Sequence, residues 1–137
     1  MIAGIASPGL WLGMISTRLH GFVDYAVALL LSGLAASRSL SVPVRKALGS
    51  AGAYHASYSV LTDYEAGLRP WLAMRQHLAL DALGAVARCG AGLLVRRQRP
   101  GERAVLVAVG LSELAVVALS RATPASGPRE DLIAGNV

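Results

Sequence analysis

The sequence has few charged residues and a single cysteine. Charged side chains make up 15% of the 137 residues, whereas an average soluble domain has about 25%. Cys89 is the one cysteine, which excludes an intrachain disulfide and a metal site built from several thiolates. Aromatic residues make up 5% and no basic stripe is interleaved with them, so the net charge of +5 does not indicate nucleic-acid binding.

Apolar residues take the place of the missing charges. They form 54% of the chain, and the mean hydropathy is +0.51. Four apolar stretches cover residues 19–37, 47–62, 76–95 and 104–120, each close to the ~20 residues that cross a hydrocarbon core as a helix. A soluble helical bundle is the alternative, but the chain has too few charges to cover four solvated helix faces. The sequence therefore predicts an all-α fold, a membrane four-helix bundle.

Three regions are expected along the chain. Residues 1–17 form an interfacial N-terminal segment, residues 18–121 form the four-helix transmembrane domain, and residues 122–137 form a flexible tail rich in Pro, Gly and Ser. Basic residues fall unequally on the two membrane faces: Arg38, Arg45, Lys46, Arg96, Arg97, Arg99 and Arg103 on one, and Arg18, Arg69, Arg75, Arg121 and Arg129 on the other. The positive-inside rule places the richer face in the cytoplasm and both termini outside it.

One short motif occurs twice. The segments RLHGFVDY (18–25) and RQHLALD (75–81) share the pattern R-x-H-x-x-x-D at an offset of 57. At an offset of 58, His55 falls on Glu113, and Leu-Thr (61–62) falls on Leu-Ser (119–120). The sequence thus predicts two duplicated helical hairpins, related by an axis normal to the membrane.

The repeated histidines and aspartates are the candidate metal ligands. His20 and Asp24, and likewise His77 and Asp81, are four residues apart and share one helical face. The first and third spans run in the same direction, so the two pairs should lie at one depth. Inward-facing carboxylates and histidines on neighbouring helices form metal sites in bundle cores, and this ligand set suits zinc, manganese or iron.

Further charged residues stand at the same membrane face. Asp63 and Glu65 follow the second span, where either could complete the metal shell or act as a general base. Arg18 and Arg75 could hold an anionic group such as a lipid phosphate. Whether the chain is an enzyme stays open; if it is, a metal-activated water attacking a lipid-like substrate is the natural chemistry.

A second polar layer is predicted deeper in the membrane. Arg88 stands 11 residues after His77, about three helical turns on, while Glu113 and His55 lie near the middle of their spans. A buried Arg88–Glu113 ion pair could lock the bundle. Alternatively, a proton or ion path could run through His55 and Glu113.

Three other interpretations use the same residues. The chain could be a non-catalytic subunit of a membrane complex or a proton-coupled small carrier, oligomeric in either case. It could be a haem b protein with His20 and His77 as axial ligands. In a purely structural interpretation, His20 hydrogen-bonds Asp24, and the two motif arginines reach the headgroups and pair with Asp63 or Glu65.

Three segments resemble a family of small bacterial membrane proteins with four predicted spans, described as hypothetical or SPW-repeat-like. The matching positions are Arg18, Leu19, His20, Gly21, Asp24 and Tyr25, then Leu61, Thr62, Glu65 and Gly67, then His77, Leu78, Leu80 and Asp81. The resemblance covers about residues 18–90, and the chain departs from it at LLVRRQRP (93–100), where that family shows Pro-Trp followed by Gly-Phe. It implies a four-span fold in a bacterial inner membrane and an important motif, and it implies no reaction.

Overall fold

Four α-helices make up most of the described part of the chain, residues 13–95 and 97–123 of the computed structural model. Their bounds are Thr17–Ala36 (α1), Val42–Val60 (α2), Met74–Leu94 (α3) and Pro100–Leu119 (α4). Within these described ranges the chain forms no strand beyond two isolated bridges. The prediction of an all-α chain with four helices is confirmed. Most of the interfacial segment predicted at 1–17, including Trp11, and most of the tail predicted at 122–137 lie outside the described residues.

All four helices begin earlier than the predicted apolar stretches, and α2 and α4 begin earlier by the most. Pro43 lies in the first turn of α2, and Pro100 is the first residue of α4. A proline stabilises a first turn because its missing N–H has no intrahelical partner there. Arg45 and Arg103, expected in loops, are therefore helical. Their Nε atoms donate to backbone carbonyls at the end of the preceding helix, Ala35 O and Gly92 O, each at 2.8 Å.

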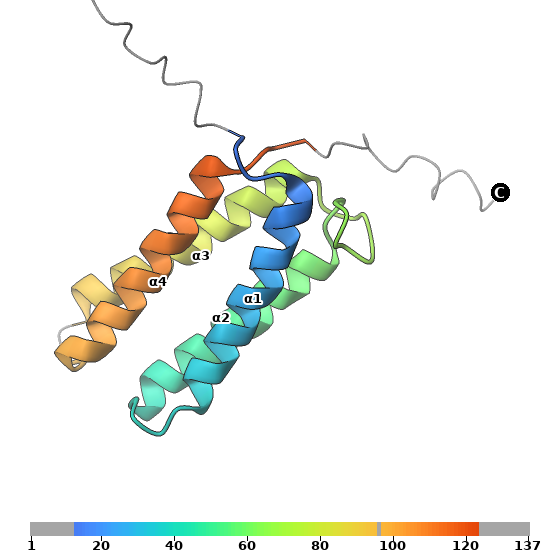
Figure 1. Ribbon diagram of the computed structural model, residues 1–137. Helices are drawn as coiled ribbons and strands as arrows, with labels where there is room; N and C mark the ends of the chain where they lie inside the picture. The colour runs from blue at the N-terminus through green and yellow to red at the C-terminus, as the bar shows by residue number, and fades with distance from the viewer. Residues whose placement is uncertain (1–12, 96, 124–137) are drawn as a thin grey trace, which may run out of the picture.

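The helices pack as two hairpins, α1 with α2 and α3 with α4 (Figure 1). A glycine allows close approach in each: a Cβ on Gly52 would lie 3.2 Å from Ala28 O, and one on Gly110 would lie 2.7 Å from Ala85 O. Ala85 stands 57 positions after Ala28, and Gly110 stands 58 after Gly52. Matching contacts therefore recur at the offsets of the repeated motif, although the duplication itself stays a prediction.

The two ends of the bundle differ. The start of α1, the end of α2, the start of α3 and the end of α4 gather at one end, here called end A (Figure 1). The turn 37–41 and residues 97–99 lie at the opposite end, end B. At end A the backbone of Ile15 makes two hydrogen bonds around the C-terminal end of α4. Ile15 N donates to Leu119 O at 2.9 Å, and Arg121 N donates to Ile15 O at 3.0 Å. Thr17 on α1 and Leu119 on α4 are thereby held at the same level.

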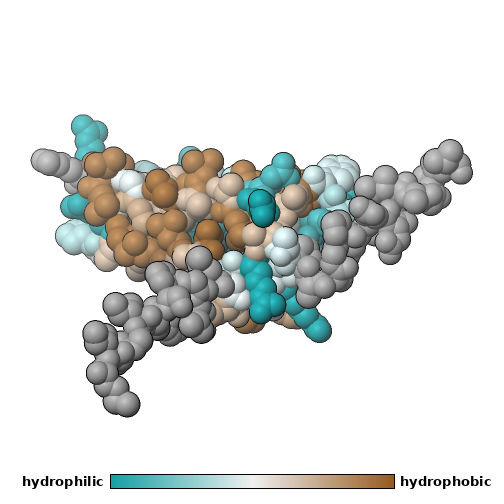
Figure 2. Space-filling view, turned by 90° about the horizontal axis from the view of Figure 1, so that it is seen from above, coloured by the Kyte–Doolittle hydropathy of each residue, from teal (hydrophilic) through white to brown (hydrophobic). Residues whose placement is uncertain are grey.

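Polar residues are buried and large apolar residues are exposed to an unusual extent. An apolar cluster contains Leu31, Val44, Leu48 and Leu106, but eleven polar or charged residues of the described ranges are also buried. Outside, Leu29 is 74% exposed and Leu83 is 63% exposed. Figure 2 shows an apolar band along the side of the molecule, with hydrophilic residues towards either end. Two of the described helices, α1 and α3, are long and apolar enough to cross a membrane.

Candidate metal centre

The four predicted ligands come together inside the bundle near end A. His20 and Asp24 lie one turn apart on α1, and His77 and Asp81 lie one turn apart on α3. Because the two helices run in the same direction, the pairs meet at one depth. All four residues are buried, with exposed fractions of 0–3%. One ligand atom from each lies within 4.8 Å of the others. We call these four residues the His/Asp cluster.

The distances within the cluster are short and uniform. His20 Nε2 lies 3.2 Å from His77 Nε2, 3.2 Å from Asp24 Oδ1 and 3.1 Å from Asp81 Oδ2. His77 Nε2 lies 3.1 Å from Asp24 Oδ2 and 3.2 Å from Asp81 Oδ2. Ligand atoms about 2.0–2.1 Å from a tetrahedral zinc ion lie about 3.3–3.4 Å from one another. These five contacts, two of which use different oxygens of Asp24, are close to that spacing, and one ligand atom from each residue lies within 4.8 Å of the others.

Two hydroxyl groups fix the orientation of the imidazoles. Thr62 Oγ1 lies 2.8 Å from His77 Nδ1 and donates its own proton to Tyr58 O at 2.7 Å. Ser120 Oγ lies 2.7 Å from His20 Nδ1 and donates to Val116 O at 2.6 Å. Because each hydroxyl proton goes to a carbonyl, each hydroxyl oxygen accepts from an Nδ1–H. In the neutral imidazoles both Nε2 lone pairs then point into the cluster, as metal ligation requires.

Two tyrosines hold the carboxylates. Tyr64, in the loop between α2 and α3, donates to Asp24 Oδ2 at 2.8 Å, and Tyr58 on α2 donates to Asp81 Oδ1. Burial, together with the negative charge of Asp24, raises the pKa of Tyr64 above its usual value. The Tyr64 phenol therefore stays a proton donor across the physiological range. Outer hydrogen bonds of this kind orient metal ligands.

His55 lies closer to the cluster than the sequence indicated. It was expected in the deeper layer with Arg88 and Glu113, yet His55 Nε2 lies 3.5 Å from Asp24 Oδ1. Its Nδ1 shares a 2.8 Å hydrogen bond with Tyr58 OH. Asp24 is seven residues from the start of α1 and His55 is five residues from the end of α2, so antiparallel helices bring them to similar depths.

Arg88 and Glu113 form the buried ion pair that the sequence predicted between the third and fourth spans. Their exposed fractions are 7% and 4%, and Arg88 Nη2 contacts Glu113 Oε2. The pair joins α3 to α4 within one hairpin. Its two predicted roles, a lock of the bundle and a step in a proton path, stay predictions.

The remaining predicted site residues lie apart from the His/Asp cluster. Glu65 is half-buried and accepts a 2.7 Å hydrogen bond from Thr17 Oγ1, and Asp63 is also half-buried. Neither is among the residues whose ligand atoms gather within 4.8 Å. Arg18 and Arg75 are exposed at end A. The catalytic and anion-binding roles of these four residues stay predictions.

A cavity of about 210 Å³ adjoins the His/Asp cluster. Its lining includes His20, Asp24 and Asp81 from the cluster, together with His55 and Glu113. Among the described residues, His55 Nε2 has no hydrogen-bond partner although it is buried. The cavity has room and polar partners for water or a small ligand beside the cluster.

Comparison with known proteins gives no match: no family model, no curated protein and no solved structure is similar to the chain. The fold and the His/Asp cluster therefore carry the functional argument. The resemblance to four-span bacterial proteins stays a prediction.

Proposed function

We propose that the chain is an integral membrane protein whose His/Asp cluster binds one divalent transition-metal ion, zinc fitting best. The observation that carries the proposal is that the two histidine Nε2 atoms lie 3.2 Å from each other and each lies 3.1–3.2 Å from an oxygen of both aspartates. Two neutral imidazoles and two carboxylates neutralise a divalent cation. Four protein ligands in a closed, buried arrangement are typical of a structural zinc site.

The outward apolar surface supports insertion into a bilayer. In each of α1 and α3, only 28% of the most apolar 18-residue stretch is buried inside the bundle. The core helix of a soluble protein, by contrast, is mostly buried. Buried charges inside and exposed leucines outside form the distribution expected of a protein surrounded by lipid. We further infer a bacterial inner membrane with end B, rich in arginine, facing the cytoplasm.

The ion would connect the two hairpins and hold them together. One His/Asp pair belongs to α1 and the other to α3, so an ion held by both ties the hairpins together at end A. Without an ion, the cluster brings two lone pairs and two carboxylates together at short range. Metal binding then contributes directly to folding stability.

A catalytic role is the second candidate, favoured by the cavity of about 210 Å³ beside the ligands. A zinc ion held by only three of the four residues would keep a position for water and would lower the pKa of that water, so supplying a nucleophile at neutral pH. In this interpretation His55, whose Nε2 makes no hydrogen bond within the described part of the chain, accepts a proton in the cavity, and a lipid-like substrate reaches it from the bilayer. A non-catalytic subunit role, with the same residues relaying protons, would use the cluster without metal.

The haem interpretation fits the geometry poorly. A porphyrin would have to pass between two Nε2 atoms that are 3.2 Å apart. Both of these nitrogens also face aspartate oxygens at 3.1–3.2 Å. An absorption spectrum without a Soret band would agree with this geometry.

Elemental analysis of the purified full-length protein tests the metal proposal. We expect about one zinc per chain in the wild type and loss of most of it in His20→Ala. Glu102→Gln is the control, because it changes a buried carboxyl residue in the first turn of α4, at end B and away from the His/Asp cluster, and should keep the metal. A metal-free wild type reloaded with neither zinc, manganese nor iron would refute the proposal.

A further inference from the structure

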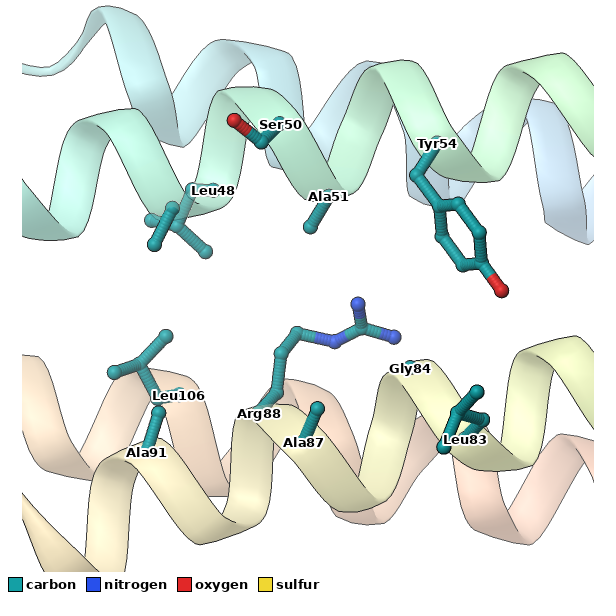
Figure 3. Close-up of a pocket in the computed structure, with 11 residues that line it drawn as sticks. Leu48, Ser50, Ala51, Tyr54, Leu83, Gly84, Ala87, Arg88, Ala91 and Leu106 are labelled. Carbon is teal, nitrogen blue, oxygen red and sulfur yellow. The ribbon is translucent and has the colours of Figure 1, made fainter.

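A second cavity, of about 450 Å³, lies between α2 and α3. Figure 3 shows its lining drawn from the facing sides of the two helices. Much of the lining consists of small residues: Ala47, Ala51, Gly84, Ala87 and Ala91. The volume is within the range of about 300–1,000 Å³ that small-molecule sites occupy. Small side chains on two facing helices therefore leave space for a ligand at the junction of the hairpins.

One buried cation projects into this space. The guanidinium of Arg88 points from α3 into the gap between the helices (Figure 3), although the residue is only 7% exposed. Among the described residues, Arg88 Nε has no hydrogen-bond acceptor. The ring of Tyr54 also points into the gap from α2 (Figure 3). A buried donor without an acceptor is costly, so a ligand oxygen at this position would be stabilising.

The charge of the site selects a neutral ligand. Glu113 already neutralises Arg88 through their ion pair, so an anionic ligand would leave an uncompensated negative charge at a buried position. Arginine can only donate hydrogen bonds. The complementary ligand is therefore an uncharged molecule with an apolar body and an acceptor oxygen, such as a carbonyl.

The corresponding face, between α1 and α4, carries the 210 Å³ cavity beside the His/Asp cluster, and Val27 lines it. At four lining positions of the α2–α3 cavity the residue 57 or 58 places away is valine or leucine: Val27 for Gly84, Leu31 for Arg88, Leu34 for Ala91 and Val109 for Ala51. At two others it is smaller: Ala26 for Leu83 and Ser112 for Tyr54. The four valine and leucine residues belong to the apolar core or pack against it. At Ala51 and Ala91 the α2–α3 face thus carries smaller side chains than the valine and leucine at the corresponding positions.

We propose that the α2–α3 cavity binds a neutral, lipid-soluble carbonyl compound of the quinone type, with its oxygen at Arg88. The apolar body would lie along the alanine and glycine residues of α2 and α3. This binding uses no residue of the His/Asp cluster and does not depend on the metal.

Titration of the full-length protein in lipid nanodiscs with a quinone carrying one isoprene unit tests the proposal. The double variant Ala51→Val, Ala91→Leu introduces the residues found at the corresponding positions 109 and 34 and should weaken binding by roughly tenfold or more. Ala87→Leu, at the exposed rim of the cavity, is a second filling variant in case the double variant is unstable. Ala79→Leu adds volume at an exposed position of α3 outside the cavity and should leave the affinity unchanged.

Three results would overturn the proposal. The first is no saturable quinone binding by the wild type, which would mean that the cavity holds only water or lipid tails. The second is saturable binding of decanoate in preference to the quinone, which would make the ligand class anionic. The third is unchanged quinone affinity in both filling variants, which would place the ligand elsewhere.

Discussion

His20 Nε2 and His77 Nε2 lie 3.2 Å apart, and the two residues are 57 positions apart in the sequence. With Nδ1–H of each ring donating to a hydroxyl group, both facing nitrogens carry lone pairs in the neutral state. Two lone pairs at this distance repel each other unless a proton or a cation lies between them. Two aspartate oxygens complete the surroundings, which favours a divalent cation over a single proton.

Removing the hydroxyl groups should weaken metal binding without removing a ligand. Thr62→Val and Ser120→Ala each delete the acceptor of one Nδ1–H, so the imidazoles lose their fixed orientation. Loss of such outer contacts typically lowers metal affinity about 10–100-fold. Competition with a chromophoric zinc chelator measures the change. Thr62→Ser keeps the hydroxyl and should bind like the wild type; equal weakening in this control would assign the effect to packing.

Metal removal should lower the stability of the whole bundle. The ion is proposed to join α1 to α3, so a chelator should reduce the melting temperature of the detergent-solubilised protein. An ion at about 1,000 times its Kd stabilises the folded state by about 4 kcal/mol. The His77→Ala variant should melt lower than the wild type and show no further change with chelator. A chelator effect of the same size in that variant would contradict a shared site.

Arg88 and Glu113 should be energetically coupled. Each would be an unpaired buried charge without the other, and breaking such a pair typically costs about 3–5 kcal/mol. We expect Arg88→Leu and Glu113→Leu each to lower the thermal stability sharply, and the double variant to recover much of the loss. Single variants as stable as the wild type would show that the ion pair contributes little.

Metal content and activity of the same Arg88 and Glu113 variants distinguish a structural role of the ion pair from a role in a proton path. Glu113 lines the cavity beside the cluster, but it is not among the four proposed ligands. A double variant that is stable, keeps its metal and retains any measured activity assigns the pair to structure. A stable but inactive double variant assigns Glu113 a role beyond the ion pair.

The orientation in the membrane can be tested by cysteine labelling in intact cells. End B carries Arg38, Lys46, Arg97 and Arg99 as exposed residues, so both termini should be outside the cytoplasm. With Cys89 replaced by Ala, a cysteine at position 126 should react with an impermeant maleimide before lysis. Labelling only after lysis would reverse the orientation.

Much of the cluster could be predicted because local spacing and repetition determine it. A four-residue separation places His20 and Asp24 on one helical face, and the offset of 57 predicts that His77 and Asp81 join them. The pairing of Arg88 with Glu113 followed from the cost of isolated buried charges. Four helices followed from the apolar stretches, whereas the starts of α2 and α4 precede those stretches because Pro43 and Pro100 lie in the first turns of these helices.

The hydrogen bonds that other residues make to the His/Asp cluster could not be predicted from spacing and repetition. Tyr64 reaches Asp24 from a loop, and loop conformation depends on backbone bonds such as Trp71 N–Leu61 O at 2.9 Å. The role of Ser120 had a sequence signal, since it stands 58 positions after Thr62. The position of His55 could have been found by comparing its depth from the end of α2 with that of Asp24 in α1.

X-ray absorption at the zinc edge of the purified, zinc-loaded protein tests the central claim most directly, because it reports the ligands of the ion itself. The account predicts a four-coordinate ion with nitrogen and oxygen ligands only and the scattering of two imidazoles. In His77→Ala, any residual zinc should show one imidazole at most. A spectrum with no imidazole, with a single imidazole in the wild type, or with the six oxygen ligands of a loosely bound ion would contradict the site formed by His20, Asp24, His77 and Asp81.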